Sequence, residues 1–449
     1  MPARSSRYDV AVLGGGAAGC VLAARLSEDP DRRVCLVEAG PDYGHYDDGR
    51  WPAELLDART VALSHPWPTD REDRSQLRAR VVGGCSAHNV CIALRGIPAD
   101  YDEWPGWSHA QIEPYLQRAE EMLEVREFAD EEISPWHRAW IDSGKAAGLG
   151  GGAHPVSTRG TLRWHTAFAY LDPARRRPNL TIRPDTLVDR VEPDRGRVLT
   201  AEGSLEADLI VLAAGAYGSP GILLRSGIGP GLEHDLPVGE ELTDHVGIGF
   251  GWAPTQRLMA DTRSFEAEHP LFGPQESLWT EDQKTFVILW NEWAEDELSF
   301  TGVVFSMKPH SRGRVSLNAA WPEDPLRIDH RWLSDARDRE ALLGGAELVR
   351  ELASTLGDYV ETEIRPGPSA DIGAYVDAEV RGFFHPVGTC GIGRVVEPDG
   401  RVRGLDGLYV ADASVMPTIP RANTHLSTIA VAERIAEGLC SPNRNPQPS

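Results

Sequence analysis

The sequence predicts an α/β protein in which a Rossmann-like domain is joined to an α+β domain built on an antiparallel sheet. Residues 8–38 read as strand, helix and strand, which is the pattern of a parallel β-α-β unit. Residues 246–384 carry short strand-like runs mixed with Trp and charge, as in an antiparallel sheet with one solvated face. The chain has 449 residues, more than one ordinary core holds, so we expect two domains.

The predicted elements are of ordinary length and follow one another in this order along the chain. Residues 41–80 show no period and are rich in Asp, Arg, Pro and Trp, so we expect loops and short pieces there. Ser334 is the expected N-cap of the helix that follows it. Strands are expected at Tyr8–Leu13, Arg33–Glu38, Leu180–Val191, Ser204–Ala214, Thr285–Trp290, Gly302–Met307, Gly313–Leu317 and Leu408–Ala411, and helices at Ala17–Ser27, Ala110–Val125, Trp136–Ala147, Asp335–Thr355 and Ser427–Leu439.

This order of elements divides the chain into a discontinuous first domain and an inserted second one. The first domain is expected to comprise residues 1–245 and 385–440, because the strand and helix after residue 408 belong with the N-terminal unit. The second domain is expected at 246–384. Residues 441–449 are mostly Pro, Asn and Ser, and we expect them to form a frayed tail.

Charge and cysteine usage exclude several classes of function. Asp and Glu number 68 against 45 Lys and Arg, a formal net charge of −23, which argues against nucleic-acid binding and docking on anionic membranes. No signal-like apolar segment precedes Tyr8, and no apolar run reaches the roughly 20 residues of a membrane span. The six cysteines are scattered without a partner cluster, so we expect reduced thiols, no metal site and a cytoplasmic location. A homo-oligomer is compatible with the sequence, which does not decide the oligomeric state.

The glycines after the first predicted strand indicate a dinucleotide site. Gly14, Gly16 and Gly19 fit the pattern G-x-G-x-x-G between a strand and a helix, and Glu38 ends the next strand. Gly14 permits a tight turn, Gly16 lets the backbone approach a pyrophosphate, and Gly19 lets the helix pack closely on the strand. The N-terminus of the helix offers unpaired N–H groups to the phosphates, and Glu38 is expected to accept a hydrogen bond from a ribose hydroxyl. These residues alone do not separate FAD from NAD.

Further motifs carry glycines, histidines and acids in a fixed order: 80–96 (RVVGGCSAHNVCIALRG), 177–180 (RPNL), 215–230 (GAYGSPGILLRSGIGP), 236–245 (LPVGEELTDH), 385–389 (HPVGT) and 410–417 (VADASVMP). In this order they resemble the glucose-methanol-choline (GMC) oxidoreductase family, and the resemblance spans nearly the whole chain. Within the family, the segment 83–89 is similar to that of choline oxidases. Members are usually longer, and the difference falls in residues 41–80 and in the middle domain.

The resemblance implies an FAD-binding domain of the kind shared with p-hydroxybenzoate hydroxylase, and a substrate domain whose antiparallel sheet roofs the flavin. Gly83 and Gly84 are expected to let a loop pass close to the flat isoalloxazine ring, where a Cβ would clash. The resemblance also places Asn89 and the backbone of residues 84–88 near the flavin. It places Asp412 and Ala413 near the pyrophosphate or ribitol. The cofactor-binding residues expected in full are Gly14, Gly16, Ala17, Ala18, Gly19, Glu38, Ala39, Val82, Gly83, Gly84, Cys85, His88, Asn89, Val90, Val188, Ala214, Gly215, Asp412, Ala413 and Thr424.

The resemblance also implies a catalytic pair, His385 and His425, on the same side of the flavin. Many relatives carry Asn at the position of His425 and others carry His. An alcohol oxidation needs a base for the hydroxyl proton while a hydride leaves the same carbon for flavin N5, and imidazole suits this task near neutral pH. We expect His385 to be the base and His425 to hydrogen-bond the substrate oxygen; the two roles are interchangeable at this level. The aromatic residues Trp290, Trp293 and Phe383 are candidates for lining the pocket.

His88 is a candidate for a covalent bond to FAD, because some relatives carry such a bond in this glycine-rich stretch. The alternative is a His88 that only hydrogen-bonds or fills space. A covalent bond would tether the cofactor and raise its potential.

The expected activity is the oxidation of a primary or secondary alcohol to the carbonyl, with oxygen or another acceptor re-oxidising the flavin. A dehydrogenase with a non-oxygen acceptor and a flavin-containing lyase of the hydroxynitrile lyase kind remain alternatives. A light-driven decarboxylase would need an apolar tunnel, and a nicotinamide enzyme would lack the 83–96 segment. The sequence does not name the alcohol.

Overall fold

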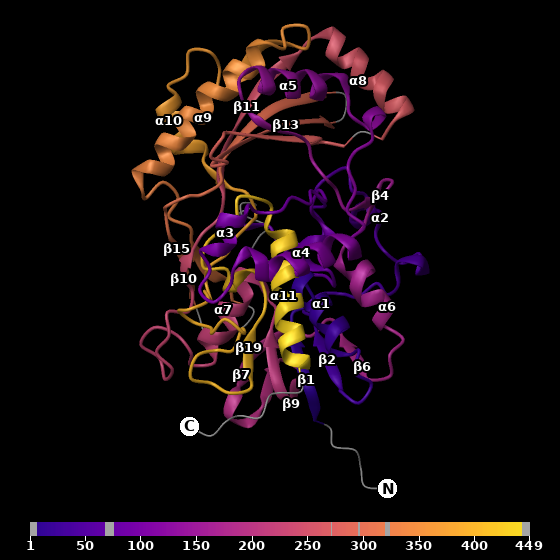
Figure 1. Cartoon of the computed structure of the whole chain (residues 1–449), viewed down its shortest axis with the longest axis vertical. Helices are drawn as coiled ribbons and strands as arrows, with labels where there is room; N and C mark the ends of the chain where they lie inside the picture. Colours follow the sequence, from indigo (N-terminus) through magenta and orange to yellow (C-terminus); the bar gives the residue numbers. More distant parts are fainter. Residues whose placement is uncertain (1–6, 68–75, 271, 295–296, 319–323, 442–449) are drawn as a thin grey trace.

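The first sheet of the protein combines strands from the N-terminal part, from residues 180–212 and from the C-terminal part of the chain (Figure 1). The structure is a computed structural model that describes residues 7–67, 76–270, 272–294, 297–318 and 324–441. The β-α-β unit is present as predicted, with β1 (Tyr8–Leu13), α1 (Ala17–Leu26) and β2 (Val34–Val37). β1 and β2 pair in parallel and are almost wholly buried, because both faces of the sheet are covered.

The strand order of the first sheet is β6-β2-β1-β9-β8-β7, and β19 (Leu408–Val410) pairs with β9. β9 (Gly203–Leu212) is long enough to pair in parallel with β1 and β19 at its carboxyl end and in antiparallel with β8 (Arg197–Thr200) at its start. The C-terminal strand β19 therefore completes a sheet that begins at residue 8.

The prediction of a single strand at Leu180–Val191 is wrong. The structure has two strands there, β6 (Leu180–Arg183), which extends the sheet in parallel beside β2, and β7 (Val188–Glu192), which pairs in antiparallel with β8. Between them Pro184 lacks an N–H to donate, and Asp185 adopts φ +49°. A proline followed by a residue in the left-handed region interrupts the ladder.

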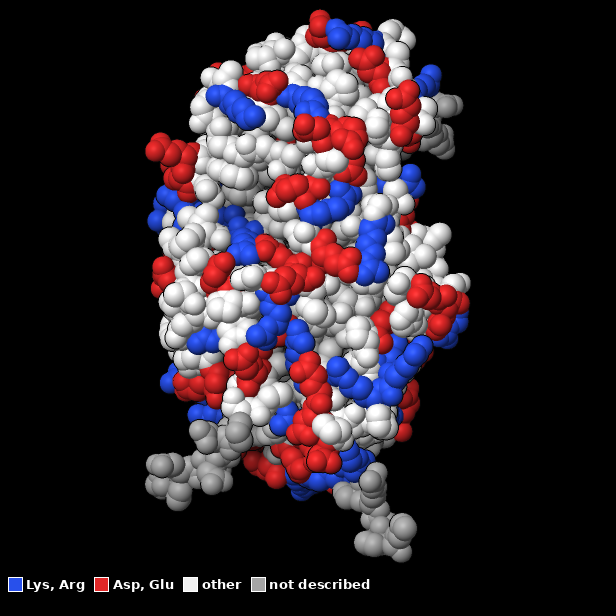
Figure 2. Space-filling view, turned by 45° about the vertical axis from the view of Figure 1, so that its right-hand side comes forward, with Lys and Arg blue, Asp and Glu red and all other residues white. Residues whose placement is uncertain are grey.

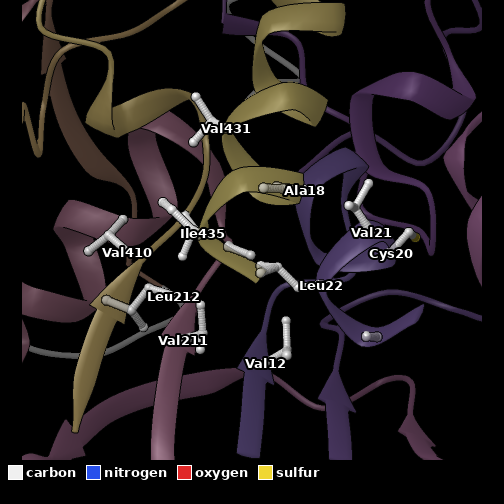
Figure 3. Close-up of a cluster of buried hydrophobic side chains, with 14 of the residues drawn as sticks. Val12, Ala18, Cys20, Val21, Leu22, Val211, Leu212, Val410, Val431 and Ile435 are labelled. Carbon is white, nitrogen blue, oxygen red and sulfur yellow. The ribbon is translucent and has the colours of Figure 1, made fainter. Parts of the chain in front are cut away.

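The core of this first part lies between the sheet and two helices that come from opposite ends of the chain. Figure 3 shows Ala18, Val21 and Leu22 of α1 near Val431 and Ile435 of α11 (Thr424–Cys440), above Val12, Val211 and Val410 of three strands. Glu433 of α11 is buried and forms an ion pair with Arg25 of α1. Burial of these apolar faces fixes both helices on one face of the sheet.

The second sheet is antiparallel throughout, in the order β17-β11-β14-β13-β12-β3, with β18 beside β11. Its helices α5, α8, α9 and α10 gather at one end of the molecule (Figure 1). Along β13 (Thr285–Ala294), Val287 and Leu289 pack with these helices, while Ile288 and Trp290 point the other way into a cavity. The face expected to be solvated is therefore partly a cavity wall. The bounds of the other elements of this part are α5 (Pro135–Ala146), β3 (Gly150–Ala153), β11 (Val246–Pro254), α8 (Gln256–Glu268), β12 (Glu276–Trp279), β14 (Glu297–Ser306), α9 (Ala336–Ser354), β17 (Val360–Arg365), α10 (Ile372–Glu379) and β18 (Arg381–Gly382).

Two segments cross the expected boundary between the domains. α5 and β3 precede residue 246 yet pack into the second sheet, where Trp136 and Trp140 are fully buried. β15 (Gly313–Leu317) and β16 (Leu326–Asp329) lie within 246–384 yet pack on α7 (Gly215–Arg225). β15 pairs with β10 (Glu240–Leu242) on one side and with β16 on the other. We propose that the two domains follow the two buried cores. α5 and β3 then belong to the second domain, and β15 and β16 belong to the first.

Two helix starts differ from the prediction. The N-cap of α9 is Asp335, whose side chain accepts a hydrogen bond from the backbone N–H of Arg337, and not Ser334. Asp and Ser are equally good caps, so the sequence pattern did not separate adjacent candidates. The last helix begins at Thr424, three residues before the predicted Ser427, because the polar first turn hid its start.

The remaining elements are α2 (Ala53–Leu56), α3 (Pro98–Asp102), α4 (His109–Met122), β4 (Thr158–Arg159), β5 (Leu162–Arg163) and α6 (Asp172–Ala174). Acidic and basic side chains are interspersed over the face drawn in Figure 2. No helix within the described ranges is long and apolar enough to cross a membrane. The expected tail lies outside the described residues, apart from Ser441.

Candidate active site

A cavity of about 450 Å³ lies between the first sheet and the second. Its walls combine the glycine loop after β1, the 84–90 segment, the start of α7, the aromatic side of the second sheet and the start of α11. Its lining includes Gly14, Gly16, Ala17, Ala18, Glu38, Ala39, Gly84, Cys85, His88, Asn89, Val90, Val188, Ala214, Gly215, His385, Asp412, Ala413, Thr424 and His425 among the residues predicted from the sequence.

The glycines of the first loop have the geometry that their pattern predicts. Gly14 has φ +106°, and a Cβ on Gly19 would lie 1.8 Å from the carbonyl oxygen of Gly14, so only glycine lets α1 approach the strand. A Cβ on Gly16 would meet only the Cα of Gly84, at 3.9 Å, and Gly16 lines the cavity. Gly19 itself lies behind the loop and does not line the cavity.

Three helices point their N-termini at this cavity. α1, α7 and α11 begin at Ala17, Gly215 and Thr424, and none of the three has a side-chain hydrogen bond at its N-cap. The first N–H groups of a helix lack intrahelical acceptors, and the helix dipole places partial positive charge there. The cavity is therefore suited to an anionic group such as a pyrophosphate.

Two buried carboxylates brace the loops around these helix ends. Glu38 accepts hydrogen bonds from the backbone N–H groups of Gly15 and Gly40 at 2.7 and 2.9 Å, and burial raises its pKa to about 6. Asp412 accepts from the N–H of Gly215 at 2.9 Å, from the hydroxyl of Ser219 at 2.5 Å and from the N–H of Ser414 at 2.8 Å. Burial raises the pKa of Asp412 as well. Each acid thus ties one glycine-rich turn to a neighbouring strand end.

The 83–84 glycines act differently from the expectation. Gly83 does not line the cavity; its φ is +97°, and a Cβ there would lie 3.0 Å from the Nδ1 atom of His165. A Cβ on Gly84 would lie 2.7 Å from the Cα of Gly16. Glycine is therefore required by contact with protein atoms at both positions. Val82 is fully buried and also lies outside the lining.

His385 lies in the segment that follows β18 (Arg381–Gly382), and each of its ring nitrogens lies beside a polar atom. Its Nδ1 lies 2.9 Å from Nδ1 of His245, and its Nε2 lies 3.3 Å from Nδ2 of Asn423. Its backbone N–H donates to Oδ1 of Asp244 at 2.9 Å. Burial, with His245 and His425 nearby, lowers the pKa of His385 well below its usual range, so the ring is neutral at pH 7.

His425 and His88 leave buried nitrogens unpartnered at the cavity. Both ring nitrogens of His425, and Nδ1 of His88, have no hydrogen-bond partner among the described residues. Burial lowers the pKa of each histidine to about 4. His425 also lies in the first turn of α11, where the helix dipole disfavours an imidazolium. An unsatisfied buried nitrogen facing a cavity is poised to bond a ligand there.

The structure brings together residues that the sequence did not single out. His245, Asp244 and Asn423 surround His385, although only the first two fell in a quoted motif and none was given a role. Trp67 and Arg78 line the cavity from the segment predicted as loops, and no periodic signal marks them. Trp290 and Phe383 line it as expected, with Ile288, Val303 and Phe305 beside them, while the side chain of Trp293 lies outside the described structure.

Comparisons with known proteins give the family. Models described as GMC oxidoreductase match residues 8–247 and 309–432. The chain belongs to the GMC oxidoreductase family. Members of the family are FAD-dependent, and the chain is an oxidoreductase acting on CH–OH donors.

Individual relatives of this GMC oxidoreductase match nearly end to end. An oxygen-dependent choline dehydrogenase of Photobacterium profundum is 29% identical over 97% of this chain and 93% of the relative. Oxygen-dependent choline dehydrogenase 1 of Chromohalobacter salexigens is 31% identical over 97% of this chain and 95% of the relative. The crystal structure of pyridoxine 4-oxidase from Mesorbium loti superposes with a TM-score of 0.84 at 27% identity, covering 96% of this chain and 99% of that chain. This agreement establishes the mixed FAD-binding sheet and the antiparallel substrate sheet as the family fold.

Proposed function

We propose that this GMC oxidoreductase oxidises an uncharged alcohol bearing an aromatic or apolar group, with His385 as the base. The observation that carries the proposal is the placement of His385 and His425 on one cavity beside an aromatic wall. Phe305 and Phe383 stack with ring centroids 3.7 Å apart, and Phe383 meets His385 edge to face at 4.7 Å. An aromatic substrate would pack on this wall with its hydroxyl toward the histidines.

The carboxylates of the cavity support an uncharged substrate. Among the described lining residues, the acids are Glu38, Asp324 and Asp412, and none comes from the aromatic wall. Glu38 and Asp412 are occupied by the glycine-rich turns. Recognition of a quaternary ammonium such as choline would favour a free carboxylate beside the aromatic rings. The choline activity named for the relatives is therefore not the one we propose here.

The roles of the two histidines follow from their partners. His385 is neutral and takes the hydroxyl proton, while His425, whose ring nitrogens are free to face the cavity, hydrogen-bonds the substrate oxygen. FAD, when bound, accepts the hydride at N5. The three helix N-termini and the open space over Gly16 fit its pyrophosphate, and the residues we assign to it are those predicted residues that line the cavity.

Other features of the cofactor and acceptor remain proposals of this kind. His88 is the candidate for covalent attachment, supported by its unpartnered Nδ1 at the cavity. Oxygen is the proposed acceptor. We also propose a cytoplasmic location for the protein.

The experiment is anaerobic reduction of the purified flavoprotein with a panel of alcohols. Benzyl alcohol and pyridoxine are expected to bleach the visible flavin band faster than choline, aliphatic alcohols or aldoses. Faster bleaching by choline would refute the substrate class. A protein that binds FAD and is bleached by no alcohol would favour the lyase alternative. Acid precipitation of a second portion of the protein tests covalent attachment, since covalently bound flavin stays in the pellet.

The electron acceptor is tested on the sample that an alcohol has reduced. Air is admitted to it, and the rate of flavin re-oxidation shows whether oxygen is the acceptor.

A further inference from the structure

His245 lies directly behind His385, on the side away from the cavity. It follows Asp244 at the start of β11 and is fully buried. The described cavity lining includes His385 and Asn423 but not His245. The two imidazole rings are perpendicular, with their centroids 5.1 Å apart.

A hydrogen-bond contact is present at each ring nitrogen of His245, and the two partners are chemically different. Nε2 lies 3.0 Å from the carbonyl oxygen of Pro420, and Nδ1 lies 2.9 Å from Nδ1 of His385. A carbonyl oxygen only accepts, so Nε2 of His245 must carry the proton. Burial lowers the pKa of His245 to about 3, so the ring is neutral and has only this one N–H.

The proton on His385 follows from this. Because Nδ1 of His245 carries a lone pair, the contact between the two Nδ1 atoms is a hydrogen bond only if Nδ1–H of His385 donates. His385 is itself neutral, so its Nε2 has no proton. The amide Nδ2 of Asn423, which only donates, lies 3.3 Å from that Nε2 and agrees with this assignment.

We propose that His245 is a positioning residue that fixes the tautomer of His385, so that Nε2, on the Asn423 side at the cavity, is the proton acceptor. The inference rests on the proposed role of His385 as the base. The substrate hydroxyl would replace the Asn423 amide at the lone pair of Nε2 and give its proton there. The hydride on the same carbon would leave for the flavin, if FAD is bound. The Nδ1–H bond to His245 is kept throughout, so no second proton has to move. Without this hydrogen bond, the ring of His385 would also populate the tautomer that carries the proton on Nε2. That tautomer would present an N–H to the substrate hydroxyl and could not accept its proton.

The surroundings hold both ends of this chain of hydrogen bonds. The carbonyl of Pro420 precedes Arg421, whose N–H and Nε bond to the buried Asp100 at 2.7 and 2.9 Å. At the other end, the carboxylate of Asp244 accepts from the backbone N–H of His385. Pro420, His245 and His385 are therefore anchored from three different segments of the chain, which limits rotation of either ring.

A pair of variants separates the tautomer from packing. His245→Gln places an amide where Nε2 stood and can still donate to Pro420, but it offers no acceptor to Nδ1 of His385. His245→Asn places its amide oxygen near the former Nδ1 and can accept the hydrogen bond from Nδ1–H of His385. General-base catalysis contributes about 10²- to 10⁴-fold, so we expect His245→Gln to slow anaerobic flavin reduction by about 10²-fold with little change in KM. His245→Asn is expected to recover at least about tenfold of that loss, because it keeps the acceptor. Equal rates for the two variants, at equal flavin content, would overturn the proposal.

A spectroscopic measurement tests the tautomer without turnover. The holoenzyme with ¹⁵N-labelled histidine is expected to show a proton on Nδ1 of His385 and a bare Nε2, with the signals assigned by their loss in His385→Asn. A proton on Nε2 instead would overturn the inference even if alcohols reduce the flavin. A proton on Nδ1 in a protein that no alcohol reduces would support the tautomer while refuting the proposed function, so the two failures are distinguishable.

Discussion

Gly84 and Gly16 contact each other through their backbones, and a Cβ on Gly84 would lie 2.7 Å from the Cα of Gly16. The contact joins the two glycine-rich segments of the cavity, one after β1 and one beginning the 3-10 turn at residues 84–87. Gly84 also has φ +53°, which disfavours any side chain. Two glycines that are far apart in the sequence thus allow the two segments to lie in close contact.

Gly84→Ala is expected to lower FAD binding by at least about tenfold, because the new Cβ pushes the two loops apart while adding backbone strain. Flavin content per protein and the Kd for FAD of the reconstituted apoprotein measure the effect. Gly344→Ala is the matched control, since Gly344 is exposed in α9 with nothing within 4 Å of a new Cβ. Equal flavin content in the two variants would contradict the prediction.

The rate of flavin reduction is expected to stay level from mildly alkaline pH down to about 6.5, the ordinary pKa of histidine, and to fall only in more acidic solution. The base must be unprotonated, and burial keeps the pKa of His385 below its usual range, so protonation needs more acid than usual. Stopped-flow reduction across this range, at constant flavin content, provides the check. A limb that titrates above pH 7 would show that another group is the base.

His425→Ala is expected to slow flavin reduction by about 10²-fold, because it removes the proposed hydrogen bond to the substrate oxygen. His425→Asn, which keeps a polar group at that position, is expected to lose less. Single-turnover reduction rates and KM for both variants give the comparison. If the alanine variant reduces at the wild-type rate, the histidine has only a structural role.

Phe383→Leu is expected to raise KM for benzyl alcohol several-fold and to leave small aliphatic alcohols nearly unchanged. The substitution removes the ring that stacks on Phe305, and an aromatic pair contributes about 0.5–1.5 kcal/mol beyond its buried area. Steady-state kinetics with both alcohols test it. The same KM change for the two substrates would indicate general damage to the pocket.

Arg25→Met is expected to lower the free energy of unfolding by about 2 kcal/mol, because it leaves the buried Glu433 with a weaker set of partners. The effect falls short of that for a fully buried pair, since Arg25 is partly exposed and Arg118 still contacts Glu433 at 3.1 Å. Urea unfolding of the holoprotein measures it. Arg339→Ala, which breaks an exposed pair with Asp377, is the control and should change little.

The glycine loop, its strand and its helix could be predicted because their causes are local. Gly14, Gly16 and Gly19 are dictated by a turn and a helix within six residues of each other, and the structure has the geometry that their spacing implies. Four of the six family motifs, 80–96, 215–230, 385–389 and 410–417, contribute residues to the cavity lining, while 177–180 and 236–245 do not. By contrast, the break after β6 and the start of α11 depended on a single proline and a polar first turn, which periodicity does not register.

The sequence by itself determined the family, the cofactor class and the two histidines at the cavity. Only the tertiary structure decided what surrounds His385, because its partners His245 and Asn423 lie 140 and 38 residues away along the chain. The same holds for Gly83 and Gly84, where an added Cβ would meet His165 and Gly16, neighbours that the sequence did not indicate. A hydrogen bond between distant side chains depends on how two sheets and three helix ends are packed, and no spacing within one segment encodes that packing.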